Sequence, residues 1–204
     1  MLEYKDLDPR KKAYVFEMDD VLFPESDYLL QVYYLFANFI EFSEGTPPSK
    51  DLIDLFRTTY KHHGDEGIFD RVKEGFGIDE KYRVNFERLY FSARLPLKLL
   101  LYIPVLKLLQ EIIIDRKQIF IVTNGKAEIQ LNKIRQTEWN GIENYLKVYF
   151  AGEIKLKPEP DVLSYIIQEH KLQRKDFVIV GASGIDEEFA ISCGIDYVHV
   201  AEFL

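Results

Sequence analysis

Polar residues that can take part in chemistry follow four apolar runs of this sequence, each at the point where the run ends. Glu17 and Asp19 follow the first run, and Thr123-Asn124-Gly125 follows the second. Lys157 comes shortly after the third, and Asp186 follows the fourth together with Gly181-Ala182-Ser183. If the runs are parallel strands, their carboxyl ends meet at one edge of a sheet. The four clusters therefore predict a single site.

The elements that would position this site alternate along the chain. Apolar runs rich in β-branched and aromatic residues predict strands, which are AYVFEM, QIFIVTN, KVYFAG, DFVIVGAS and DYVHVAEF. Helical spacing of apolar residues separates most of them, in IPVLKLLQEII, KAEIQLNKIRQTEW, KPEPDVLSYIIQEHKL and GIDEEFAISCG. Alternating strands and helices are typical of an α/β fold with a parallel sheet covered on both faces.

Residues 25–93 have a different pattern. Four segments show helical apolar spacing, with no strand between them, and EGTPPS and GFG act as breakers. We expect an all-helical cap inserted after the first strand, and a core domain formed by residues 1–24 and 94–204. The aromatic residues of the first cap helix are predicted to form the core of the cap; they are Tyr28, Tyr33, Tyr34, Phe36 and Phe39.

Composition limits the function classes. The chain has 204 residues, is 47% hydrophobic and carries a net charge of −8, which favours a soluble protein and disfavours nucleic-acid binding. The most apolar run is interrupted by two lysines and two prolines, which disfavours a membrane span. A single cysteine, Cys193, and a charged N-terminal segment predict a cytoplasmic protein without a signal peptide.

The order and spacing of the four clusters resemble the haloacid dehalogenase (HAD) superfamily, in the subgroup with a helical cap after the first motif. The matching segments are EMDDVL, IFIVTNG, KLKPEPDVL and VIVGASGID, which together extend over nearly the whole chain. The resemblance implies a Rossmannoid three-layer core and phosphoryl transfer through an aspartyl-phosphate. In that chemistry one acid attacks phosphorus, and a second acid protonates the leaving group and then activates water.

The resemblance also implies roles for individual residues. Asp19 fits the acid/base, Thr123 the phosphate-binding hydroxyl, and Lys157 the amine that balances charge. Asn124 would line the phosphate pocket, and Asp186 fits the second acid of the fourth motif. Mg²⁺ is the implied cofactor of an active enzyme. Its candidate ligands here are Glu17, Asp19 and Asp186.

Two positions depart from the family pattern. Glu17 stands at the position of the aspartate nucleophile, and Ala182 at the position of a metal-binding aspartate. Glutamate carries the same charge one methylene further from the backbone, and a misplacement of about 1 Å can cost about 10²-fold in rate. Alanine offers no oxygen to Mg²⁺, which demands near-ideal octahedral geometry. Glu17 is long enough to reach Lys157, so we predict a Glu17–Lys157 ion pair, direct or through one water.

Several residues also have simpler interpretations. Glu17 and Asp19 could be exposed acids at a strand end, and Asp186 could only stabilise a helix N-terminus. The adjacent His62 and His63 point to different sides of a helix, which favours solvated residues over a metal site. Cys193 is interpreted as a packing residue.

Three functions remain open from the sequence. The first is a phosphatase-type HAD-like protein with impaired or lost hydrolase activity and a residual pocket for a small phosphorylated molecule or inorganic anion. The second is an active Mg²⁺-dependent phosphomonoester hydrolase in which Glu17 serves as nucleophile or metal ligand. The third is a non-catalytic scaffold or regulatory protein.

Overall fold

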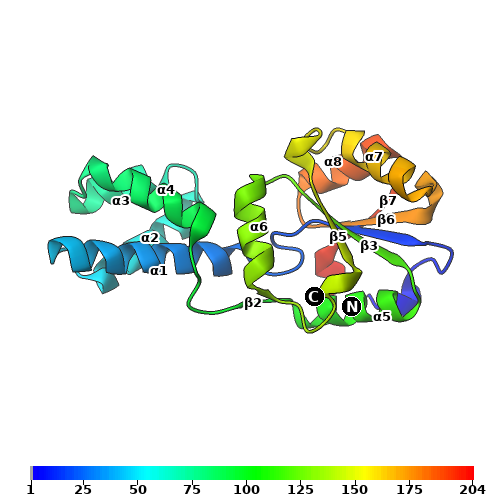
Figure 1. Ribbon diagram of the computed structural model, residues 1–204, viewed down its shortest axis with the longest axis horizontal. Helices are drawn as coiled ribbons and strands as arrows, with labels where there is room; N and C mark the ends of the chain where they lie inside the picture. The colour runs from blue at the N-terminus through cyan, green and yellow to red at the C-terminus, as the bar shows by residue number, and fades with distance from the viewer. Residues whose placement is uncertain (1) are drawn as a thin grey trace. The chain divides into compact units, whose positions relative to one another are not determined.

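The computed structural model describes residues 2–204, which divide into two compact units (Figure 1). The sheet unit comprises the chain up to Pro24, Leu100–Gln130 and Thr137–Leu204, and the helical unit comprises Glu25–Leu99 and Leu131–Gln136. The helical unit thus contains the predicted insertion and continues to Leu99. It also includes Leu131–Gln136, which the sequence predicted to be part of the core domain.

The sheet unit is built on five parallel strands, in the order β5-β3-β1-β6-β7. These are β1 (Ala13–Phe16), β3 (Gln118–Thr123), β5 (Leu146–Phe150), β6 (Phe177–Gly181) and β7 (Asp196–His199). All five lie within the predicted apolar runs or one residue from them. The prediction of an α/β fold with a parallel sheet is confirmed.

Helices cover both faces of this sheet. They are α5 (Ile103–Ile114), α6 (Ala127–Gln136, which runs into the helical unit), α7 (Asp161–His170) and α8 (Gly184–Cys193). Figure 1 shows α7 and α8 on one face and α5 on the other. Val15, Phe120 and Ile179 pack with Leu163 of α7 and Phe189 of α8 in one buried cluster. Burial of such side chains holds the strand ends in fixed positions.

Shorter elements connect these parts. Two-residue strands are β2 (Leu99–Leu100) and β4 (Thr137–Glu138), and single 3-10 turns are Tyr4–Asp6, Glu80–Tyr82, Glu143–Tyr145, Ala151–Glu153, Arg174–Asp176 and Val200–Glu202. The helix predicted over residues 126–139 ends at Gln136, because Thr137 and Glu138 adopt the extended backbone of β4.

The helical unit contains four helices where the sequence predicted them. They are α1 (Glu25–Glu44), α2 (Ser49–His63), α3 (Ile68–Phe76) and α4 (Arg83–Ser92). Aromatic rings form its core: Tyr33 stacks on Phe56 at 4.8 Å, and Phe36 meets Phe86 edge to face at 4.9 Å. Tyr34 is an exception to the predicted core, since it is 46% exposed on α1. Within residues 2–204, every helix is too short or too polar to span a bilayer.

Candidate functional site: a buried carboxylate–lysine cluster

The first strand places Glu17 directly at the carboxyl edge of the sheet. The backbone N–H of Glu17 donates to the carbonyl of Val180 at 3.1 Å, which continues the pairing of β1 with β6 for one residue. The chain then turns tightly, with Leu22 N–H donating to the Met18 carbonyl at 2.9 Å. This turn sets the carboxylates of Glu17 and Asp19 near the same strand ends.

Lys157 lies between two carboxylates. Its Nζ donates to Glu17 Oε2 and, at 2.5 Å, to Asp186 Oδ1. All three side chains are largely buried: Lys157 and Asp186 are each 3% exposed, and Glu17 is 13% exposed. The predicted Glu17–Lys157 ion pair is therefore confirmed as a direct contact. The participation of Asp186 was not foreseen.

Asp186 also caps its own helix, as the alternative interpretation proposed. Its Oδ2 accepts from Ser183 Oγ at 2.8 Å, and from the backbone N–H groups of Ala182 and Ser183 at 3.1 Å each. The absence of a side chain at Gly181 permits this approach, since a Cβ there would lie 2.3 Å from the Asp186 Cβ. One carboxylate thus serves both the helix N-terminus and the buried ammonium.

The charges in this cluster do not balance one to one, because one ammonium faces two carboxylates. Burial raises the pKa of Glu17 even though Lys157 opposes the shift. Burial also acts on Asp186, but there Lys157 and Ser183 prevail and lower the pKa of its carboxyl group. Against its own burial, Lys157 has a raised pKa because of Glu17 and Asp186. Lys157 is therefore paired with both carboxylates, Asp186 is held in addition by Ser183, and burial shifts Glu17 toward its neutral form.

A second set of contacts joins Thr123 and Asp19 through Gln130. Gln130 Nε2 donates to Asp19 Oδ2 at 2.8 Å and to Thr123 Oγ1 at 2.7 Å. Thr123 and Gln130 are buried, and Gly125 leaves the space for the amide, since a Cβ there would lie 2.5 Å from Gln130 Nε2. Because Thr123 Oγ1 accepts from Gln130, its own proton remains available to a neighbouring oxygen. The role of Gln130 was not predicted, because this residue lies inside α6 and away from the strand ends.

Asn124 fixes the loop that carries Lys157. Its Nδ2 donates to the Lys157 carbonyl at 3.0 Å, and its Oδ1 accepts from the Lys157 N–H at 2.8 Å. Both polar atoms of the Asn124 side chain are therefore hydrogen-bonded to the backbone of Lys157. This reciprocal pair positions the lysine, a contact that the sequence did not reveal.

The residues do not fit Mg²⁺, the cofactor that the family resemblance implies. Glu17 and Asp186 both face Lys157, and the methyl group of Ala182 offers no oxygen. Across residues 2–204, no three His, Cys, Asp or Glu side chains gather in a way that could hold a metal ion. A carboxylate bound to an ammonium presents fewer lone pairs to a cation.

His62, His63 and Cys193 lie outside this cluster. His62 and His63 are exposed at the end of α2. Cys193 is buried at the end of α8, and burial raises the pKa of its thiol. A buried thiol of this kind is unreactive, which agrees with its interpretation as a packing residue.

The family model of haloacid dehalogenase-like hydrolases matches residues 14–200. This chain belongs to the HAD-like hydrolase family. The match begins in β1, extends past the end of β7 and includes all four polar clusters. No curated protein matches the chain in a sequence comparison.

Solved structures with the same fold span most of this chain. A defluorinating L-2-haloacid dehalogenase gives a TM-score of 0.60 at 16% identity, over 93% of this chain and 82% of that one. A putative phosphoglycolate phosphatase from Lactobacillus delbrueckii gives 0.55 at 18%, over 92% and 85%. A HAD family hydrolase from Deinococcus radiodurans, with bound phosphate and sodium, gives 0.57 at 12%, over 94% and 81%. At these identities the likeness concerns the fold.

Proposed function

We propose that this chain is a phosphatase-type HAD-like protein whose hydrolase chemistry is impaired or lost, and whose remaining pocket binds a small phosphorylated molecule or an inorganic anion. The observation that carries the proposal is the contact of Glu17 with the buried Lys157. The residue at the nucleophile position is already committed to a partner inside the protein.

Two properties make Glu17 a poor nucleophile. Its Oε2 is bound by Lys157 and its Oε1 accepts from the Met18 N–H at 2.8 Å, so both oxygens are held. Burial also raises its pKa, which disfavours the carboxylate form that would attack phosphorus. Asp19 keeps the position of the acid/base, but without an attacking group it has no leaving group to protonate.

The anion-binding part of the proposal rests on Lys157 and Thr123. Lys157 is a buried ammonium, and its attraction for an anion is strengthened by the low local dielectric. The incoming anion competes with Glu17 for this ammonium, and protonation of Glu17 removes one negative charge from the site. The phosphate bound to the Deinococcus radiodurans hydrolase supports phosphate as the first anion to test.

The test combines a phosphatase assay with a binding assay. Hydrolysis of p-nitrophenyl phosphate is measured during a Mg²⁺ titration for the wild type and for Glu17→Asp with Ala182→Asp. We expect no Mg²⁺-dependent turnover in the wild type and a gain in the double variant. Glu17→Asp with Ala182→Asn is the matched control, because it has the same size and lacks the second carboxylate.

Anion binding is measured as the rise in melting temperature with phosphate, sulfate or tungstate. We expect the rise to disappear in Lys157→Met. Wild-type turnover that is lost in Glu17→Gln would instead support an active hydrolase that uses Glu17. Absence of turnover in every variant and of any anion effect would support a scaffold or regulatory role.

A further inference from the structure

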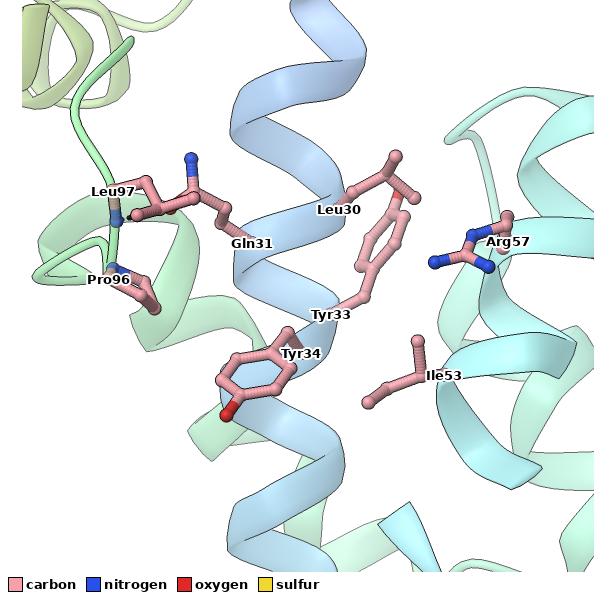
Figure 2. A pocket seen from close by; sticks show the side chains of 8 residues that line it. All are labelled: Leu30, Gln31, Tyr33, Tyr34, Ile53, Arg57, Pro96 and Leu97. Atoms are coloured by element: carbon pink, nitrogen blue, oxygen red, sulfur yellow. Dashed lines mark hydrogen bonds between the residues drawn. The ribbon is translucent and has the colours of Figure 1, made fainter. Parts of the chain in front are cut away.

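The helical unit has a cavity of its own, of about 300 Å³ (Figure 2). Its lining comes from α1, α2 and the segment that follows α4, and includes Leu30, Tyr34, Ile53, Arg57, Pro96 and Leu97. All of these residues belong to the helical unit. The shape of the cavity therefore does not depend on where the sheet unit lies.

Two of the cavity walls are held in place by contacts inside the helical unit. Tyr33, a further lining residue, is fully buried, stacks on Phe56 and donates its hydroxyl to Asp65. Gln31 accepts from the backbone N–H of Leu97 at 2.8 Å, which fastens the segment after α4 to α1. A pocket whose walls are already ordered costs little conformational entropy when a ligand binds.

The lining combines apolar surface with one positive charge. Leu97 is 71% exposed, so a ligand that covers it removes apolar surface from water. Arg57 extends from α2 toward Leu30 and Tyr33 of α1 in Figure 2. Its ion pair with Asp54 spans 3.6 Å and its side chain is 64% exposed, which is the weak kind of surface pair. Within the described residues, no acidic side chain lines the cavity.

We infer that this cavity binds a small carboxylic acid with one aromatic ring or one branched aliphatic group. The planar guanidinium of Arg57 matches a carboxylate with two parallel hydrogen bonds. Leu30, Ile53 and Leu97 would contact the apolar part of the ligand. A volume of about 300 Å³ is at the lower end of the range for small-molecule sites, which favours a single ring over a fused ring system. This site does not rest on the state of Lys157.

The test uses 3-phenylpropionate as the probe and its neutral analogue, 3-phenylpropanol, as the uncharged comparison. Binding to the full chain is measured by calorimetry or ligand-observed NMR. We expect the acid to bind in the millimolar range or tighter and about tenfold more tightly than the alcohol, a factor typical of one charge-assisted interaction. Arg57→Gln should remove this preference. Arg88→Gln, which removes an exposed arginine of α4 outside the cavity, should leave it unchanged.

A second variant tests whether the apolar part of the ligand lies in this cavity. Ile53→Trp fills the cavity, so it should abolish binding of both the acid and the alcohol, with circular dichroism and melting temperature as checks of folding. The inference is overturned if 3-phenylpropionate does not bind at 10 mM (about ten times the weakest affinity expected), or if Arg57→Gln binds it as the wild type does. It is also overturned if the folded Lys157→Met variant no longer binds the probe, because this would place binding at the Lys157 site.

Discussion

Replacement of Lys157 by methionine tests the buried cluster most directly. Methionine keeps the length and apolar stem of lysine but removes the ammonium that two buried carboxylates share. Leaving a buried charge without its partner costs about 3–5 kcal/mol. For a chain of this size the melting temperature should fall by roughly 6–20 °C. The variant Lys155→Met, which removes an exposed lysine two residues earlier, is the matched control and should change stability by less than about 1 kcal/mol.

The same cluster predicts an order among three substitutions. Lys157→Met should be the most destabilising. Asp186→Asn should follow at about 3 kcal/mol, because it removes one charged partner of the ammonium and also places an amide among the helix-capping bonds. Glu17→Gln should cost only about 1 kcal/mol, since the raised pKa of Glu17 means that burial already disfavours its charge.

Thermal or urea unfolding of the three variants, followed by circular dichroism, gives this order. A cost below about 1 kcal/mol for Lys157→Met would refute the reasoning, because it would show that the two carboxylates need no internal cation. So would a Glu17→Gln variant less stable than Asp186→Asn, because Glu17 would then contribute more than a carboxylate that both pairs with Lys157 and caps α8. Combining Lys157→Met with Glu17→Gln should recover part of the loss if the two residues are coupled.

Two further predictions concern acidity and packing. Because the pKa of Glu17 is raised on folding, its protonated form stabilises the fold below pH 4.5, and this contribution is lost as the pH rises through the raised value. The stability of wild type relative to Glu17→Gln should therefore decrease with rising pH in urea titrations, and an increase would contradict the stated shift. Gly125→Ala should cost about 1–3 kcal/mol, since its Cβ would displace Gln130. Gln130→Ala should relieve that cost, and Gly184→Ala, whose Cβ meets no atom within 4 Å, is the control for the substitution itself.

The sequence predicts the elements of this fold well because burial determines them. The strands from Gln118 and Phe177 are near-continuous apolar runs, which only a sheet covered on both faces accommodates. The helical segments of the insertion keep an apolar stripe and end at breakers such as Gly64 and Gly77. The exposure of Tyr34 was missed because aromatic type alone does not say which side of a helix faces the core.

The site was predicted in part, and the missed contacts share a cause. The sequence points to Glu17 because it follows β1 directly, and to Lys157 because it lies in the loop between β5 and α7, where the family resemblance places a lysine. Gln130 and the backbone bonds of Asn124 were missed because they depend on side-chain direction within the folded site. A glutamine inside a helical segment is usually solvent-exposed. In the folded site, the amide of Gln130 instead donates to Asp19 and Thr123.

Under the proposed function, Glu17 and Ala182 are explained together, as one change in buried charge. An aspartate at position 182 would add a carboxylate to a site where Lys157 already faces two, and such a site requires a further cation. With Ala182 this extra charge is absent, and Lys157 with Asp186 forms a balanced pair. Glu17 then occupies the remaining contact of the ammonium, and burial shifts it toward the neutral form that the charge balance favours. Each substitution alone would leave either an excess of negative charge or a lysine contact unfilled. This coupling is why we expect hydrolase chemistry to return only when both positions are changed to aspartate.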